Sequence, residues 1–161
     1  RGDYRFYNWE MQDSRFSQLF SLASPVDLGS LQTGSVVSTQ AFSFAVSCAP
    51  KSVILAGHDL AFTDNMNYCK DTYFEKKWLS TATRTRTMED LNWNSVVNRT
   101  DYLVRTSSGV ARTCSQMFVA KLWLEDFVSK KPKFPVYNTS PGSIFERNVI
   151  KYKLSELLLT V

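Results

Sequence analysis

Residues 52–59 read Ser-Val-Ile-Leu-Ala-Gly-His-Asp, and this stretch decides the fold class. A short apolar run that follows Pro50 and ends at Gly57 is typical of a strand buried on both faces of a parallel sheet. Upstream, apolar residues recur every three or four positions over 35–48, which predicts a helix that Pro50 ends. A helix, a buried strand and an acidic turn in that order indicate an α/β protein.

Outward from this stretch, further helices and strands follow the same alternation. The pattern predicts helices over 11–23, from Thr72, from Thr87, over 115–129 and over 154–158, a hairpin around 107–109, and a last strand over 134–137. Thr72-Tyr73-Phe74-Glu75 fits a capping box, and the helix over 115–129 is apolar almost all round, which predicts heavy burial.

Together these elements predict a Rossmann-like layered sheet. Only two strands are strongly indicated as parallel, whereas a doubly wound domain has five or more, so we expect an incomplete domain that lacks its N-terminal strands. On this interpretation, residues 1–28 form a helical or linker segment, and residues 29–161 form the C-terminal part of the domain.

Composition excludes several classes of protein. The net charge of +4 comes from scattered Lys and Arg, which favours anionic small ligands over a nucleic-acid surface. No run approaches the ~18 apolar residues of a membrane-spanning helix. Cys48, Cys69 and Cys114 form an odd set without Cys-x-x-Cys spacing, so we expect no zinc site or disulfide framework and a reducing, cytoplasmic location. The motifs of P-loop, serine-hydrolase and zinc-protease sites are absent from the sequence.

The ends of the predicted strands and the start of one helix are the places where ligands bind in open α/β sheets. Gly57 and Asp59 follow the first strand, the turn Asn138-Thr139-Ser140 follows the last, and Thr33-Gly34-Ser35 opens the helix over 35–48. Free N–H groups at that helix start could hold a phosphate, although an ordinary N-cap explains the same residues. Likewise, a capping Asp and ordinary turn chemistry explain the two strand ends.

Two further features have both a functional and a structural interpretation. His58 is the sole histidine and the only side chain whose ordinary pKa lies near neutrality, so it is a candidate general base, but a lone histidine is more often structural. Tyr68, Lys70 and Glu75 lie in a polar, aromatic stretch that is typical of a lid over a charged sugar, or simply of a solvated loop.

The sequence resembles the motility accessory factor (Maf) family, which is grouped with a hydroxymethylpterin pyrophosphokinase-like domain. The most specific similarity is Val-Ile-Leu-Ala-Gly-His-Asp-Leu-Ala-Phe-Thr over 53–63, where the family has a strand ending in Gly-Gln-Asp-Leu-Ala-Phe/Tyr. Residues 34–41, 68–75 and 112–125 are also similar, and Asn138-Thr139 with Gly142 resembles the family's Asn-Ala-Thr-x-Gly-Gly turn. The resemblance covers about residues 29–158.

This resemblance implies a sialyltransferase-like domain that transfers a CMP-activated nonulosonic acid, such as pseudaminic or legionaminic acid, to hydroxyls of flagellin or a surface protein. It implies that Thr33, Gly34 and Ser35 face the nucleotide, that Asp59 is the catalytic residue beside the donor, and that the 68–75 segment covers the sugar. No metal or other cofactor is expected, because protein donors can stabilise the leaving CMP.

The sequence departs from the family pattern at three places. His58 replaces a Gln, so no catalytic role is carried over to it, and Gly142-Ser143 replaces a double glycine. The family's upstream Gly-Pro-Ser-Leu turn is missing, so donor binding and activity are expected of a full-length protein.

Two alternatives stay open. One is a pterin pyrophosphokinase-like phosphotransferase that depends on ATP and magnesium. The other is a non-catalytic protein-binding module that docks through the aromatic residues of 4–9.

Overall fold

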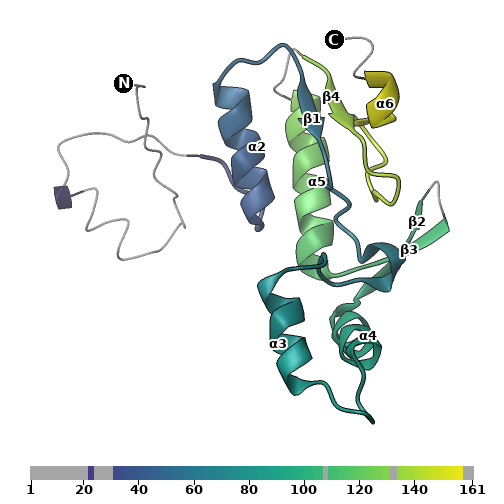
Figure 1. Cartoon of the computed structure of the whole chain (residues 1–161). Helices are drawn as coiled ribbons and strands as arrows, with labels where there is room; N and C mark the ends of the chain where they lie inside the picture. The colour runs from purple at the N-terminus through teal and green to yellow at the C-terminus, as the bar shows by residue number, and fades with distance from the viewer. Residues whose placement is uncertain (1–21, 24–30, 107–108, 131–133, 158–161) are drawn as a thin grey trace. The chain divides into compact units, whose positions relative to one another are not determined.

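The structure is a computed structural model that describes residues 22–23, 31–106, 109–130 and 134–157. The chain divides into two compact units, Arg1–Pro50 and Lys51–Val161, and each is described by itself (Figure 1). The predicted helix over 11–23 lies outside the described residues apart from Leu22 and Ala23, and so does the predicted domain boundary at residue 28.

In the first unit, the predicted helix is confirmed as α2, Val37–Ser47. It begins later than expected, because Val36 is the N-cap and the chain at Ser35 has a φ of 69°. The Thr39 hydroxyl accepts a hydrogen bond from the Gly34 N–H (2.8 Å) and donates one to the Val36 carbonyl (2.6 Å). This threonine fixes the turn that precedes the helix.

The second unit contains a parallel three-stranded sheet, so the α/β class is confirmed. Its strands are β1 (Val53–Leu55), β4 (Val136–Asn138) and β5 (Ile150–Lys151), in the order β1-β4-β5. The register places Leu55 beside Asn138, and Asn138 beside Lys151. The carboxyl ends of all three strands therefore meet at one edge of the sheet.

Two predictions about these strands are wrong. The first strand is not buried on both faces, because Ile54 is 40% exposed. The reason is that β1 is an outer strand of a small sheet. The strand predicted over 134–137, observed as β4, is not the last along the chain, because β5 follows it and pairs with the side of β4 that faces away from β1. A two-residue strand such as β5 is too short to show periodicity in the sequence.

Helices and a hairpin form a second group of elements around a small core. They are α3 (Tyr73–Thr81), α4 (Met88–Arg99), the short 3-10 helix Thr63–Asn65, and the antiparallel hairpin β2 (Tyr102–Thr106) and β3 (Gly109–Thr113). Phe62, Val96 and Cys114 are buried together, with Met117 packed against them. The predicted helices and the hairpin are confirmed.

The prediction of a capping box at Thr72 is wrong. Thr72 makes no side-chain cap, and the Glu75 carboxylate accepts from the Asp71 N–H instead. The true capping box is at α4, where the Thr87 hydroxyl accepts from the Asp90 N–H (3.2 Å) and the Asp90 carboxylate accepts from the Thr87 N–H (3.0 Å).

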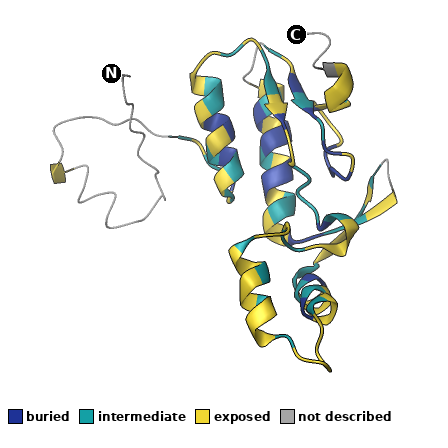
Figure 2. Ribbon diagram, viewed as in Figure 1, coloured by how far each residue is buried: buried dark blue, intermediate teal, exposed yellow. Residues whose placement is uncertain are grey.

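The helix over 115–129 is confirmed as α5, Ser115–Lys130, but it is not buried all round (Figure 2). Val119 and Leu122 are exposed, whereas Lys121 and Glu125 are buried. Their charges are compensated, because Lys121 pairs with Glu125 and both side chains bond to the chain between β4 and β5. The last described helix is α6, Leu154–Leu157. Among the described helices, none combines the length and the apolar character needed to cross a bilayer.

Candidate ligand-binding site

The turns that follow β1 and β4 are joined by hydrogen bonds of Asn138. This residue is 1% exposed, and its Nδ2 donates to the His58 carbonyl (2.9 Å) while its Oδ1 accepts from the Ser140 N–H (2.7 Å). The Ser140 hydroxyl accepts from the His58 N–H (2.9 Å), which closes the network. A buried amide that is satisfied from both turns holds the two strand ends in one arrangement.

Backbone contacts extend this join. The Thr139 N–H donates to the Leu55 carbonyl (3.0 Å), and the Ile144 N–H donates to the Asp59 carbonyl (3.1 Å). A Cβ on Gly142 would lie 2.8 Å from the Thr63 side chain, so a larger residue would force that side chain to move. The turn after β4 therefore packs closely against Thr63 of the same chain.

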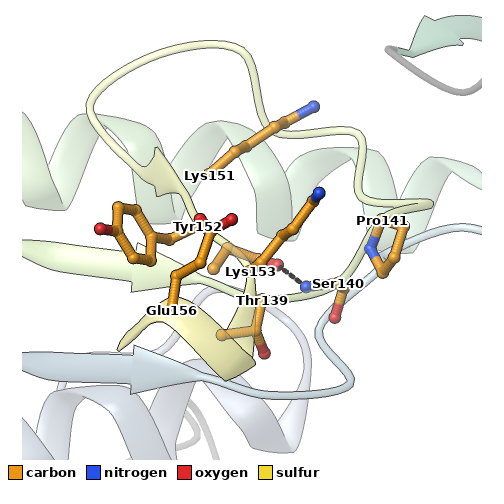
Figure 3. A pocket seen from close by; sticks show the side chains of 8 residues that line it. Thr139, Ser140, Pro141, Lys151, Tyr152, Lys153 and Glu156 are labelled. Carbon is orange, nitrogen blue, oxygen red and sulfur yellow. Dashed lines mark hydrogen bonds between the residues drawn. The ribbon is translucent and has the colours of Figure 1, made fainter. Parts of the chain in front are cut away.

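A cavity of about 470 Å³ opens at the carboxyl ends of β4 and β5 (Figure 3). The residues around it come from the turn after β4, from β5 and from the start of α6: Asn138, Thr139, Ser140, Pro141, Lys151, Tyr152, Lys153 and Glu156. Its side chains offer hydroxyl groups, two ammonium groups and one carboxylate. This donor set favours an anionic, hydroxyl-bearing ligand.

Contacts within the chain position Lys151 and Tyr152, two of the residues that line the cavity. The Lys151 Nζ donates to the Ser143 carbonyl (3.1 Å), which uses one of the three donors of its ammonium group. The Tyr152 ring packs edge-on against Tyr137, with centroids 6.0 Å apart, and the Tyr152 N–H donates to the Asn138 carbonyl (3.0 Å). The two side chains are therefore held at the sheet edge before any ligand arrives.

Comparison with known proteins adds nothing to this picture. The chain matches no family model, no curated protein and no solved structure. Function is therefore inferred from the residues of the site. In the described part of the chain, His, Cys, Asp and Glu side chains form no group of three or more that could hold a metal ion.

The structure brings one group of predicted site residues to the cavity. Asn138, Thr139 and Ser140 line it, and their contact with a ligand stays a prediction. The sequence did not point to Lys151, Tyr152, Lys153 or Glu156. The alternating Ile-Lys-Tyr-Lys of 150–153 was the available signal for them, but an alternation of four residues is weak evidence for a strand.

Gly57 and Asp59 lie in the turn after β1 and are not among the residues that line the cavity. Gly57 has a φ of +66°, a left-handed conformation that suits glycine. Asp59 is half-buried, and its carbonyl bonds to Ile144. The catalytic role of Asp59 stays a prediction.

His58 is packed as a structural residue. Its ring stacks on Phe145 with centroids 6.4 Å apart, and its Nε2 is buried without a hydrogen-bond partner among the described residues. Burial lowers the pKa of the imidazole, and the neighbouring Asp59 carboxylate opposes this only in part. The ring is therefore neutral at neutral pH.

The predicted anion site before α2 differs from the expectation in the position of Gly34 and in the use of its N–H. Gly34 lies three residues before the helix, and Thr39 already accepts a hydrogen bond from its N–H, so that donor is not free for a phosphate. The Ser35 hydroxyl donates to the Gly34 carbonyl (2.6 Å). Thr33 is half-buried. These three residues belong to the first unit and are described only within it.

Two of the three predicted lid residues make contacts at the start of α3. Tyr68 stacks on Phe74 with ring centroids 4.0 Å apart and accepts a hydrogen bond from Arg99 (3.3 Å). Glu75 bonds to the backbone before the helix, whereas Lys70 is exposed. None of the three predicted residues is among those that line the cavity. A closing movement over a sugar stays a prediction.

Proposed function

We propose that the cavity at the ends of β4 and β5 binds an anionic small molecule, and that this ligand is the CMP-activated acidic sugar of a Maf-like glycosyltransferase. The observation that carries the proposal is that Lys151 and Lys153 line the same cavity as Thr139 and Ser140, at the carboxyl edge of a parallel sheet. Ligands of α/β proteins bind at this edge.

Size and charge support this class of ligand. The cavity volume lies within the ~300–1,000 Å³ that small-molecule sites occupy. A CMP-linked nonulosonic acid carries a phosphate and a carboxylate, and the two ammonium groups outnumber the single carboxylate of Glu156 in the wall. The Thr139 hydroxyl donates to the Leu55 carbonyl (3.3 Å) and the Ser140 hydroxyl accepts from the His58 N–H (2.9 Å). Each hydroxyl keeps hydrogen-bonding capacity for the hydroxyl groups of a sugar. The finer architecture, a Rossmann-like and sialyltransferase-like domain, belongs to the same proposal.

The proposed reaction transfers the sugar to a Ser or Thr hydroxyl of an acceptor protein such as flagellin. The hydroxyl oxygen bonds to the anomeric carbon, the bond from that carbon to the phosphate oxygen breaks, and CMP leaves with the electron pair. Lys151 and Lys153 would stabilise the charge on the phosphate. The proton of the hydroxyl passes to a carboxylate, and Glu156 is the candidate in the cavity wall. Asp59, the catalytic residue that the resemblance implies, is not among the residues that line the cavity.

Titration of the full-length protein with CMP tests the proposal. We expect saturable binding that Lys151→Ala weakens about ten-fold, because a charged hydrogen bond to phosphate contributes roughly 1.5–3 kcal/mol. Lys77→Ala, which removes an exposed lysine from α3, is the matched control and should leave binding unchanged. Absence of CMP binding, or equal binding by both variants, would overturn the proposal.

The same titration separates the alternatives. Binding of ATP that requires magnesium, with no response to CMP, would favour the pyrophosphokinase-like phosphotransferase. Capture of an acceptor protein without any sugar transfer would favour the binding module. An Asp59→Ala variant that retains full transfer would remove Asp59, but not the cavity, from the mechanism.

A further inference from the structure

Much of the β2–β3 hairpin is exposed to solvent (Figure 2). Leu103 pairs with Arg112 and Arg105 pairs with Val110, so these four side chains lie on the same face of the hairpin. Leu103 is 64% exposed and Val110 is 66% exposed. Large apolar side chains at this exposure, next to two arginines, are typical of a contact surface.

The face continues onto α4. The Arg112 guanidinium lies over the Trp93 ring, 5.2 Å from its centroid, and Trp93 is itself 44% exposed. Trp and Arg are the side chains most enriched where protein partners bind tightly. We call the surface formed by Trp93, Leu103, Arg105, Val110 and Arg112 the hairpin face.

The outer edge of β2 is open. Within the described residues β2 pairs only with β3, while the outer side of β3 is bonded where the Phe62 N–H donates to the Arg112 carbonyl (2.7 Å). Backbone groups alternate between the two sides of an antiparallel strand. Because Arg112 directs its carbonyl away from β2, its partner Leu103 directs its own backbone groups away from β3, and so does Arg105 two residues on.

The charge of the hairpin face is uncompensated. Neither Arg105 nor Arg112 forms an ion pair with a carboxylate of the described residues. We propose that the hairpin face and the open edge of β2 bind an extended acidic polypeptide segment, which adds as a strand and alternates carboxylate with apolar side chains. Its backbone would bond to Leu103 and Arg105, its carboxylates would meet the arginines, and its apolar side chains would cover Leu103 and Val110.

The test uses a ten-residue fluorescent peptide of alternating Glu and Val and measures its binding to the whole protein by anisotropy. We expect saturable binding and slower hydrogen exchange at the Leu103 and Arg105 amides. Arg105→Glu should weaken binding about ten-fold, because one attraction becomes a repulsion. Arg84→Glu, an exposed arginine outside the hairpin, is the matched control and should have little effect. Circular dichroism establishes that both variants are folded.

Two modified peptides test the charge and the strand pairing separately. A Lys-Val peptide that binds as tightly as the Glu-Val peptide would overturn the acidic partner. A Glu-Val peptide with alternate backbone nitrogens methylated that binds undiminished would overturn strand addition. Two other results would assign the face to another occupant and so overturn the proposal: self-association that protects these amides without peptide, or binding only to phosphatidylserine vesicles.

Discussion

Asn138 shows how one side chain decides the geometry of a site. Its amide has a donor and an acceptor, and each is used by a different turn, so the ends of β1 and β4 cannot separate without leaving a buried polar group unpaired. The Ser140 hydroxyl accepts a hydrogen bond from the His58 N–H, and Ser140 also lines the cavity. The shape of the cavity wall is therefore coupled to the turn that contains His58 and Asp59.

His58 makes a prediction about pH at the same scale. Burial holds its pKa below the ordinary 6.5, so the unfolded chain binds more protons than the folded chain just below that pH. The stability contributed by the neutral imidazole is complete above the unfolded pKa and is lost as the pH falls towards the folded pKa. Urea unfolding at about pH 7.5 and about pH 5.5 should show this decline.

The control is His58→Gln, which removes the only histidine of the chain. We expect this variant to lose less stability than the wild type between the two pH values. An equal loss in both proteins would show that another group titrates in this range.

At the scale of single elements, two threonines with similar sequence contexts behave differently. Thr87→Ala should lower the free energy of unfolding by about 1 kcal/mol, because it removes the cap of α4. Thr72→Ala should have a smaller effect, because the buried Thr72 hydroxyl has no hydrogen-bond partner among the described residues and does not cap α3. Chemical denaturation of the two variants checks the contrast, and equal losses would contradict the capping assignment.

Helix α5 holds the chain between β4 and β5 through Glu125. The Glu125 Oε1 accepts from the Glu146 N–H (2.7 Å) and the Arg147 N–H (3.1 Å), and Lys121 bonds to the Glu146 carboxylate (3.0 Å). The Lys121 Nζ also lies 3.4 Å from the Glu125 Oε2, and both side chains are buried. This network orders the segment that leads into β5 and thus into the cavity wall.

Removing Glu125 should therefore be costly. We expect Glu125→Ala to destabilise the protein by about 3 kcal/mol, because two backbone donors and a buried ammonium lose a partner. Asp126 follows Glu125 in the same helix and forms an exposed ion pair with Lys130. Asp126→Ala should lower the free energy of unfolding by no more than about 0.5 kcal/mol. Urea unfolding of the two variants measures the difference, and similar values would show that the buried network contributes little.

At the scale of the whole molecule, the three cysteines report on tertiary packing. Cys48 and Cys69 are exposed and Cys114 is buried in the core with Phe62 and Val96. A thiol reagent should label two cysteines quickly in the native protein and the third only on unfolding. Cys114→Ser should abolish the slow phase alone, whereas three equally fast reactions would contradict this core.

The sequence by itself determined the α/β class, the helices α2 to α5 and the hairpin, because their signals are local: apolar periodicity, helix starts and turn residues within a few positions. It also placed Asn138, Thr139 and Ser140 at a strand end. Only the tertiary structure decided that the cavity wall includes Lys151 and Glu156, and that Lys121 is buried. Those outcomes depend on partners far along the chain, such as Glu146 opposite Lys121, and no local pattern records a contact of that separation.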